Sequence, residues 1–444
     1  MNHRRSIKPE RLTVPIALTG ALIMCSLVAA LSTPTIADIA ASESSIVTTH
    51  GDTIEWRTIT GDPVGSVTAD ALWTGAGPDD TIGEPRVVWN PIAHSFYAAA
   101  TSRRSPAGDD HIGDEDILTA LTPTGDPSDG WAAQRNSYRS LGFNAERLSL
   151  GAKGDGIYFT IDFDPLSPIA GCWMGVADRA LLTNGDRIRH YTQLSNTPRG
   201  FRVDESSRVN PTELLSATLN SGGFAYALLT GWNTTSPDGM LVYSWPEIPW
   251  GFPSGAHPTD FTAVKSAGGH LWAVDTVLVG SAPGVRWFDF DLRGWPDSGS
   301  APALAKHGDI TNAVAGDIAI DDAGDVVIVF ESGTGVAYSL RRGGDDVFKP
   351  AVALSESGSA PRIAEIPGGG FAVQWIDGDA SFVSVLRTAP APPVQMDLNQ
   401  DGAIDAADLG ALIAGFGTTG PGDLNGDGIV DTADLAALIG AMRQ

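Results

Sequence analysis

Residues 361–377 read PRIAEIPGGGFAVQWID. Two runs rich in apolar residues flank a Gly-Gly-Gly sequence, which is the pattern of a β-hairpin. Glycine suits such a turn because it adopts positive φ without steric cost. The stretch therefore predicts two antiparallel strands joined by a tight turn near residue 369.

Five further stretches have the same strand-turn-strand form, and they begin at Pro85, Glu146, Glu213, Phe261 and Asp317. Their turns follow one another at intervals of about 46 to 68 residues. A hairpin repeated at such intervals is typical of propeller blades, which must pack on neighbours to bury both faces. We predict a mainly β protein with a propeller-like domain over residues 44–388 and six or seven blades. A β-sandwich pair or another all-β array is the alternative, because the repeat is degenerate and has no WD or kelch signature.

The composition indicates a folded, acidic protein. Of its 444 residues, 42% are hydrophobic and 18% are charged, and the formal net charge is −25. A surface of this sign repels phosphate backbones and anionic lipid, so we expect neither nucleic acid nor membrane as a partner. It suits divalent cations or neutral glycans.

Residues 1–37 have the pattern of an export signal. Basic residues end at Arg11, an apolar run extends from Leu12 to Leu31, and Thr35 and Ala37 supply small residues for a cleavage site. We therefore expect a secreted or cell-surface protein. The apolar run is also long enough to span a bilayer, and an uncleaved anchor would hold the chain on the periplasmic side of the inner membrane.

The C-terminal domain, residues 396–444, contains a gapless duplication: DLNQDGAIDAADLGALIAGF from Asp397 and DLNGDGIVDTADLAALIGAM from Asp423. Each copy alternates oxygen-bearing side chains around a glycine, as calcium-binding loops do, and calcium prefers six to eight oxygen ligands. The predicted ligands of the first loop are Asp397, Asn399, Asp401, the carbonyl of Ala403, Asp405 and Asp408. Those of the second loop are Asp423, Asn425, Asp427, the carbonyl of Ile429, Asp431 and Asp434. We expect two Ca²⁺ ions.

A helix with an apolar face should follow each loop. Helical spacing gives the faces Leu409, Leu412, Ile413 and Phe416, and then Leu435, Leu438, Ile439 and Met442. The two short helices are expected to pack together, because one alone would be marginally stable in water.

This duplicated loop-helix unit resembles a type I dockerin. The resemblance implies an EF-hand-like fold and binding to a cohesin-like or other surface protein. The chain departs from the family at the partner-binding positions, where it has Ala406-Ala407 and Thr432-Ala433 and lacks the usual basic residues. The Ala/Leu-rich helices are similar to dockerin-like tails on exported proteins of planctomycete-type bacteria. A Pro-rich linker, residues 389–395, separates this domain from the large one.

The large domain contains no strong catalytic motif. Weak candidates are the acidic run at 109–116, the pair Asp162 and Asp164, and YSLRRGGDDVF from Tyr338, which faintly resembles the Asp-box turn of sialidase-type propellers. Most of the tryptophans are expected in the core, although they would also suit stacking on sugar rings.

The sequence thus predicts a secreted calcium-binding protein whose propeller is non-catalytic and which acts in surface display, adhesion or extracellular assembly. The alternative is a glycoside hydrolase or polysaccharide lyase in polysaccharide breakdown, brought to its substrate by the dockerin-like domain. A third reading makes the propeller a glycan-binding module.

Overall fold

The computed structural model describes residues 37–74, 80–83, 85–104, 115–137, 145–153, 156–163, 171–178, 190–195, 202–203, 214–220, 223–230, 240–244, 262–292, 303–321, 323–387, 398, 406–418, 420, 422, 424 and 429–441. These residues are mainly in β-strands, as predicted. The predicted export signal up to residue 36 and the predicted linker lie outside the described residues.

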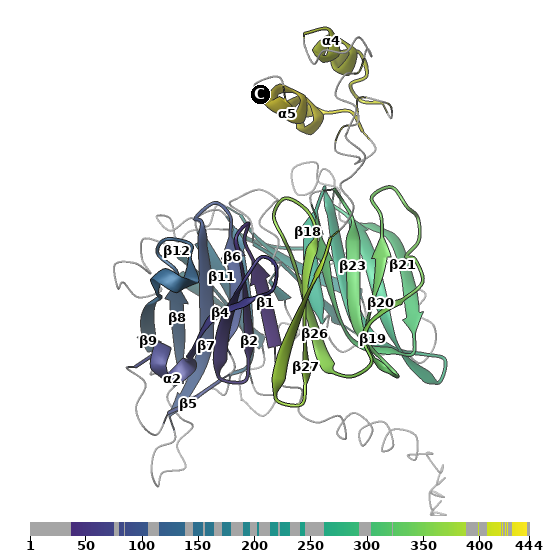
Figure 1. The fold of residues 1–444 in the computed structure, drawn as a ribbon. Coiled ribbons are helices and arrows are strands. Elements are labelled where there is room, and N and C mark those ends of the chain that lie inside the picture. Colours follow the sequence, from purple (N-terminus) through teal and green to yellow (C-terminus); the bar gives the residue numbers. More distant parts are fainter. Residues whose placement is uncertain are drawn as a thin grey trace, which may run out of the picture. The chain divides into compact units, whose positions relative to one another are not determined.

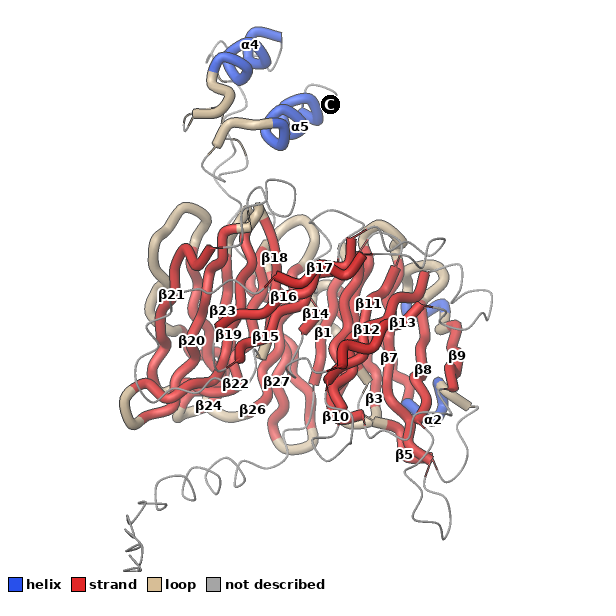
Figure 2. The backbone as a smooth tube through the Cα atoms, turned by 180° about the vertical axis from the view of Figure 1, so that it is seen from behind, coloured by secondary structure: helices blue, strands red, loops and turns tan. Residues whose placement is uncertain are grey.

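The described strands form seven antiparallel sheets, here numbered along the chain (Figures 1 and 2). Sheet 1 contains β1 (Ala37–Ala41), β2 (Ser45–His50), β3 (Thr53–Thr58) and β4 (Pro63–Thr68). Sheet 2 contains β5 (Asp80–Ile82), β6 (Arg86–Asn90), β7 (Ser95–Arg104), β8 (Glu115–Leu121) and β9 (Ala132–Ser137). Both β5 and β6 pair with β7.

Sheets 3 to 5 repeat the four-stranded meander. Sheet 3 contains β10 (Ala145–Lys153), β11 (Gly156–Phe163), β12 (Gly171–Asp178) and β13 (His190–Ser195). Sheet 4 contains β14 (Arg202–Val203), β15 (Leu214–Asn220), β16 (Gly223–Thr230) and β17 (Met240–Ser244). Sheet 5 contains β18 (Ala263–Ala267), β19 (His270–Val279), β20 (Ala282–Asp291) and β21 (Ala303–Thr311).

The last two sheets complete the large domain. Sheet 6 contains β22 (Ala313–Ile320), β23 (Val326–Ser332), β24 (Gly335–Arg341) and β25 (Val352–Ser355). Sheet 7 contains β26 (Ser359–Glu365), β27 (Phe371–Asp377) and β28 (Ala380–Leu386). The helical elements are α2 (Ala69–Leu72), the 3₁₀-helix η1 (Pro127–Asp129), α4 (Ala406–Ala414) and α5 (Thr432–Ala441).

All six predicted hairpins are present, as β6–β7, β10–β11, β15–β16, β18–β19, β22–β23 and β26–β27. The clearest turn, between β26 and β27, needs its glycines. Gly370 has φ +108°, and a Cβ at this position would lie 2.7 Å from the carbonyl oxygen of Leu386. A side chain is excluded there by both conformation and space.

The large domain begins earlier than predicted. Strand β1 pairs with β2 from Ala37 onward, seven positions before the expected start at residue 44. Residues 37–41 form a short apolar strand next to the signal-like segment, so the apolar pattern alone did not separate the two. Strands β2, β3 and β4 complete this first sheet.

The core lies between consecutive sheets. In β7, Phe96 and Ala98 pack in a cluster with sheet 1, while the alternate residues Tyr97 and Ala99 pack in a cluster with sheet 3. Because both faces of a sheet are covered, its strands are continuously apolar instead of alternating with polar residues. Strand β23 shows this most clearly, with all of Val326–Phe330 buried.

We call β1, β6, β10, β14, β18, β22 and β26 the first strands of their sheets, although the short β5 precedes β6 in sheet 2. These strands contact one another in chain order, and the sequence of contacts returns to its start. The contacts run from β1 to β6, β10, β14, β18, β22 and β26, and β26 contacts β1. Between sheets 7 and 1, Ile39 and Ile46 share an apolar cluster with Ile366 and Ala372. Residues separated by more than 300 positions thus form one continuous part of the core.

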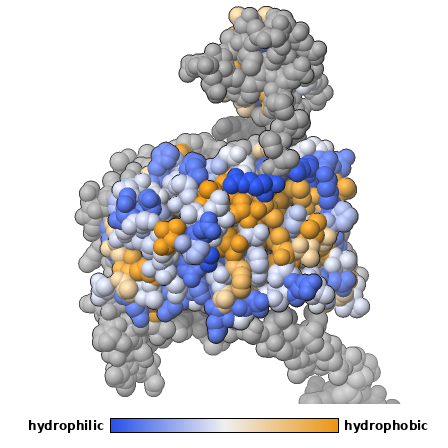
Figure 3. Space-filling view, viewed as in Figure 1, coloured by the Kyte–Doolittle hydropathy of each residue, from blue (hydrophilic) through white to orange (hydrophobic). Residues whose placement is uncertain are grey.

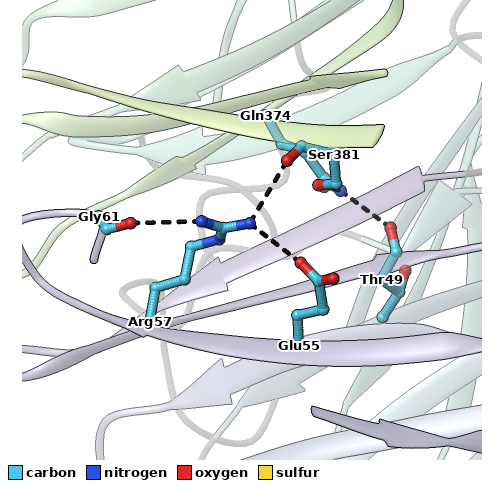
Figure 4. Close-up of polar contacts among 6 residues, drawn as sticks. All are labelled: Thr49, Glu55, Arg57, Gly61, Gln374 and Ser381. Atoms are coloured by element: carbon cyan, nitrogen blue, oxygen red, sulfur yellow. Dashed lines mark hydrogen bonds and ion pairs between the residues drawn. The ribbon is translucent and has the colours of Figure 1, made fainter. Parts of the chain in front are cut away.

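Polar side chains reinforce the junction of sheets 1 and 7 (Figure 4). Nη2 of Arg57 donates to the carbonyl oxygen of Ser381 at 3.3 Å and contacts Oε2 of Glu55 at 3.0 Å. Nε2 of Gln374 donates to the Thr49 carbonyl oxygen and to Oγ of Ser381, both at 3.0 Å. Because β1–β4 and β26–β28 belong to separate sheets, side chains form these hydrogen bonds across the junction.

The surface of the large domain is mixed. Figure 3 shows apolar side chains interspersed with polar ones on the face in view. Among the described residues, exposed large apolar side chains include Val64, Val347, Val352 and Phe382. No helix within the described residues is long and apolar enough to cross a membrane.

Candidate functional site

Two parts of the chain bring together residues capable of binding a ligand: the C-terminal helix pair and the first strands of the sheets. In the helix pair, Leu412 of α4 and Leu438 of α5 are fully buried and share a cluster with Leu424 and Val430. The predicted packing of the two helices is therefore present.

The last predicted ligand of each loop is buried beneath its helix. Asp408 and Asp434 are each 0% exposed. Oδ1 of Asp434 accepts a hydrogen bond from the Leu424 amide at 2.6 Å, and Oδ2 accepts one from the Asp431 amide at 2.8 Å. The carboxylate of α5 thus reaches back to the beginning of its own loop, as a carboxylate that closes a cation-binding loop must do.

Asp431 caps the second helix. Its Oδ1 accepts from the Ala433 amide at 2.7 Å, which satisfies one of the free N–H groups in the first turn of α5. A backbone bridge also holds the loop, because the Val430 amide donates to Thr418 and the Gly417 amide donates to Val430, each at 2.9 Å. The end of α4 and the second loop are therefore joined.

The predicted apolar face is wrong in part. Leu409 and Leu435 are partly buried as expected, but Ile413 is 56% exposed and Phe416 is 40% exposed. Helix α4 ends at Ala414, so Phe416 lies in the following turn, and the apolar cluster is completed by Leu424 and Val430 instead. Met442 lies outside the described residues.

Of the predicted calcium ligands, Asp408, Ile429, Asp431 and Asp434 are described. The remaining ligands lie outside the described residues: Asp397, Asn399, Asp401, Ala403, Asp405, Asp423, Asn425 and Asp427. Within the residues that the structure describes, no group of three or more His, Cys, Asp or Glu side chains is assembled for a metal. The donor set fits calcium in chemistry, since it consists of carboxylate, amide and carbonyl oxygens.

The second place is one position in the first strand of every sheet, immediately before an apolar residue; we call it the first-strand position. Its residues are Asp38, Arg86, Arg147, Arg202, Ala263, Asp317 and Arg362. For Arg147 and Arg202 only the backbone position is described. Charged residues are unusual so near to a core, because a buried charge must be paired and hydrogen-bonded.

Both aspartates at the first-strand position join two sheets. Asp38 accepts the Ile39 amide through Oδ1 and the Val87 amide of sheet 2 through Oδ2, both at 3.1 Å. Asp317 accepts the Ile318 amide at 2.8 Å and the Ile363 amide of sheet 7 at 3.0 Å. Each carboxylate therefore reaches the residue that follows an arginine in the next sheet, which shows that equivalent positions lie at the same level.

Cations surround Asp38. Burial raises the pKa of its carboxyl, while Arg86, the amide of Val87, Arg362 and Lys265 oppose this shift. These three basic residues come from sheets 2, 7 and 5. Charges from three other sheets therefore act on this one carboxyl group of sheet 1.

Sequence patterns did not point to this cluster, although a signal was present. Arginine precedes the first apolar residue in PRVV from Pro85, ERLS from Glu146, FRVD from Phe201 and PRIA from Pro361. A single dipeptide of arginine and an apolar residue is uninformative. Only the recurrence of this dipeptide at the same position of several predicted hairpins indicates the cluster.

The weak catalytic candidates are dispersed. In the acidic run, residues 109–114 lie outside the described residues, and Glu115 and Asp116 begin β8. Asp164 is also outside them. Asp162 pairs in register with Arg147, so its backbone lies beside the first-strand position of sheet 3.

The expected core role of the tryptophans is confirmed within the described residues for Trp73, Trp272, Trp287 and Trp375. Trp272 and Trp287 are buried, with ring centroids 5.9 Å apart, and Phe348 packs against both. The guanidinium of Arg341, from the segment that resembles an Asp-box, lies 5.0 Å from the Trp272 ring. A cation over an indole face is attractive and helps to hold this cluster. Neither tryptophan can serve as a sugar-stacking surface.

No family model matches the chain, and no curated protein matches it. Solved structures with partial similarity include polysaccharide lyase Uly1, at 9% identity and TM-score 0.46, over 80% of this chain and 90% of that one. The Dos1 propeller matches at 12% identity and TM-score 0.41, over 78% and 76%. The lectin SapL1, solved with alpha methyl fucoside, matches at 11% identity and TM-score 0.36, over 71% and 98%. Propellers and lectins are thus among the similar structures, and a function must be argued from this chain's own residues.

Proposed function

We propose that this chain is an exported protein in which a seven-bladed, non-catalytic β-propeller is attached to a calcium-dependent dockerin-like domain, and that it acts in display, adhesion or assembly outside the cell. The observation that carries this proposal is the fully buried carboxylate of Asp434, which is bonded to the start and the end of its own loop.

The propeller is supported by the contacts between first strands. Seven sheets whose first strands touch in chain order, with the last touching the first, are what a seven-bladed propeller requires. Apolar clusters on both faces of the inner sheets also fit, because a blade buries each face against a neighbour.

The calcium-binding role is supported by the oxygen-rich duplication. Asp408 and Asp434 would hold the ions from the helices, with Asp431 and the Ile429 carbonyl in the second loop. Four carboxylates in one loop repel one another without a cation, so ion binding should be coupled to the folding of the domain. The bound ions would supply this neutralising charge.

A partner surface is supported by the exposed apolar residues of α4 and its following turn. Ile413 and Phe416 are more than one-third exposed although they belong to the repeat. The proposed partner is a cohesin-like or other cell-surface protein.

Calorimetric titration of the full chain with Ca²⁺ tests the metal assignment. We expect about two sites per chain. Asp401→Ala and Asp427→Ala should each remove one site, whereas Asp379→Ala, in the turn between β27 and β28, should remove none. An unchanged titration after both loop substitutions would contradict the assignment.

Cell fractionation tests the display role. Truncation after Arg387 should move the protein from the envelope fraction to the medium in the producing cell. The Asp401→Ala, Asp427→Ala double variant should behave in the same way. Equal distribution of the truncated and full chains would contradict a docking role.

The alternative function, a glycoside hydrolase or polysaccharide lyase, is favoured by one observation. Asp38 has a raised pKa and is surrounded by Arg86, Arg362 and Lys265, and perturbed carboxyl groups beside cations often mark active sites. Assay of the full chain on a polysaccharide panel for new reducing ends distinguishes the two functions. Turnover that is lost in Asp38→Asn would establish the enzyme.

A further inference from the structure

Within the described residues, sheet 7 is one strand shorter than its neighbours. It contains β26, β27 and β28, whereas every other sheet contains four or five strands. In sheets 1, 3, 4, 5 and 6, a fourth strand pairs with the third. Strand β28 (Ala380–Leu386) occupies the place of a third strand but forms the outer edge of its sheet. Another strand can therefore add to sheet 7 at this edge.

The turn that precedes β28 determines which backbone groups face this edge. Asp377 and Ala380 pair across the two-residue turn 378–379, in which Gly378 has φ +61°. The pair that closes such a turn exchanges hydrogen bonds, and bonded and non-bonded positions then alternate along the strand. Three residues of β28 therefore direct their backbone N–H and C=O groups away from β27: Ser381, Val383 and Val385.

Sheet 1 approaches the edge without closing it. Nη2 of Arg57 donates to the carbonyl oxygen of Ser381 at 3.3 Å, in agreement with the outward direction of this group (Figure 4). A Cβ at Gly61, in the turn between β3 and β4, would lie 4.0 Å from the carbonyl oxygen of Val383. No backbone hydrogen bond joins this turn to β28 in the described part of the chain. Since a carbonyl oxygen can accept two hydrogen bonds, the edge retains its capacity to pair.

Strand β28 lacks the features that protect other outer strands. Strand β4 begins with Pro63, β21 contains Lys306 and Asp309, and β25 has only four residues. The pairing of each of these three strands also contains an irregularity of register. The seven residues of β28 include no charge and no proline, and their pairing with β27 is regular. A regular apolar edge of this kind is a template for pairing with another chain.

Packing holds β28 in place while one aromatic side chain stays exposed. Val383 and Val385 pack in the cluster shared with sheet 1, and Leu386 packs in the cluster shared with sheet 6. Phe382 is 44% exposed, although its ring stacks on Trp375 with the centroids 5.9 Å apart. A strand that is already ordered loses little conformational entropy when it pairs.

The residues that flank β28 make the strand complementary to itself in charge. Asp379 immediately precedes the strand, Arg387 immediately follows it, and both are exposed. If two antiparallel copies are related by a two-fold axis at Val383, Asp379 of each copy faces Arg387 of the other. Ser381 then faces Val385, so the outward-directed backbone groups of the two copies meet. Exposed ion pairs add little affinity, but they favour this register over shifted ones.

We propose that two copies of this chain associate through β28 and form one continuous antiparallel sheet, with three strands from each copy and the two-fold axis at Val383. The two Val383 residues lie opposite each other and exchange backbone hydrogen bonds. The two Phe382 rings are diagonal neighbours on one face, where residues are about 7–8 Å apart, and they shield each other from water. The dimer carries two C-terminal domains; that this strengthens attachment to a surface rests on the proposed function.

Sedimentation equilibrium of the full chain over a range of concentrations tests the proposal. We expect a species with twice the 46.3 kDa mass of the chain. Val383→Pro should weaken dimerisation by at least about tenfold, because proline removes an outward N–H that β27 does not use. Phe382→Lys should also weaken it, because two like charges would meet near the axis. This second variant carries the test if thermal melts show that Val383→Pro does not fold.

Val352→Lys is the matched control. Val352 is 48% exposed on β25, the outer strand of sheet 6, so the substitution makes a comparable change at a neighbouring edge. This variant should remain dimeric. Dissociation by Val352→Lys to the same extent as by Phe382→Lys would overturn the assignment of the interface to β28.

Cross-linking tests the register. Directly opposite residues of a hydrogen-bonded pair have Cα atoms about 5.5 Å apart, which suits a disulfide. Val383→Cys should therefore form a covalent dimer under mild oxidation, whereas Val352→Cys and the natural chain should not. Asp379→Arg should weaken the dimer by placing like charges together, and the double variant Asp379→Arg, Arg387→Asp should restore it.

The dimer is independent of the proposed calcium loops. Its mass should be unchanged in a chelator, so a failed calcium assignment leaves this test intact. A natural chain that is monomeric at every concentration would show that something other than a second copy covers β28, and would overturn the proposal. Dimerisation unchanged in both Val383→Pro and Phe382→Lys, or absence of the Val383→Cys cross-link, would do the same.

Discussion

Nε2 of Gln374 donates a hydrogen bond to the carbonyl oxygen of Thr49 at 3.0 Å, across the junction between the last sheet and the first (Figure 4). Gln374 is 0% exposed, and the same nitrogen also donates to Ser381. A buried amide at this place connects residues that are 325 positions apart. The junction between the last and the first sheet is therefore held by side-chain hydrogen bonds as well as by apolar packing.

Gln374→Met is predicted to lower the free energy of unfolding by about 1–3 kcal/mol. Methionine has a similar volume but cannot donate a hydrogen bond, so the buried Thr49 carbonyl would lose its bond to Gln374. Leaving a buried acceptor without its donor costs about 1–3 kcal/mol. Urea denaturation followed by tryptophan fluorescence measures the effect. Asp379→Ala, at the exposed turn of the same sheet, should change stability little. Equal stability of Gln374→Met and the natural chain would show that the junction is held by packing alone.

Gly308→Ala is predicted to destabilise sheet 5 by about 1–3 kcal/mol, the usual cost of overpacking. Gly308 pairs in register with Trp287, and a Cβ there would lie 2.8 Å from the indole ring. The ring would have to move from its contacts with Trp272 and Phe348. Near-UV circular dichroism should therefore change together with the melting temperature.

Gly333→Ala is the control for this steric effect. No atom lies within 4 Å of a Cβ at Gly333, so the substitution should leave the near-UV spectrum unchanged. If both glycine variants behave alike, the contact between Gly308 and Trp287 is not what restricts that position.

Asp38 should make stability fall as pH rises through the acid range. Its folded-state pKa is raised above 3.8 by burial, so between these two values the folded chain keeps a proton that the unfolded chain has lost. The unfolded state binds fewer protons there, and the free energy of unfolding therefore decreases with increasing pH. Asp38→Asn removes this titration.

The measurement is a comparison of urea midpoints for the natural chain and Asp38→Asn from about pH 3 to about pH 7. The stability of the natural chain relative to the variant should be highest at the lowest pH and should decline above 3.8. Other groups titrate in both proteins and cancel in the difference. A relative stability that increases with pH would contradict the raised pKa.

Asp434→Ala is predicted to loosen α5 even in the presence of a chelator. The substitution removes the acceptors of the Leu424 and Asp431 amides, both of which tie the loop to the helix. Hydrogen exchange followed by mass spectrometry should show faster exchange over residues 429–441. Thr432→Ala, an exposed residue at the start of α5, should leave the exchange rates nearly unchanged.

Local pattern predicted the hairpins well because a hairpin is determined by neighbours in the chain. The Gly-Gly-Gly turn at 368–370 and the apolar runs beside it required no information from other sheets. The same is true of the second loop of the duplication, where Asp431 and Asp434 bond to residues at most ten positions away. The apolar face of α4 was predicted less well, because Leu424 and Val430 from the other repeat also pack in its apolar cluster.

By itself, the sequence determined the strand pairs and the oxygen-rich duplication, since both follow from residue types at fixed short spacings. Only the tertiary structure decided that Asp38, Arg86, Lys265 and Arg362 act on one another, and that Gln374 meets Thr49. Single residues from sheets distant in sequence come together there, and their proximity results from the packing of whole sheets, which no short pattern encodes.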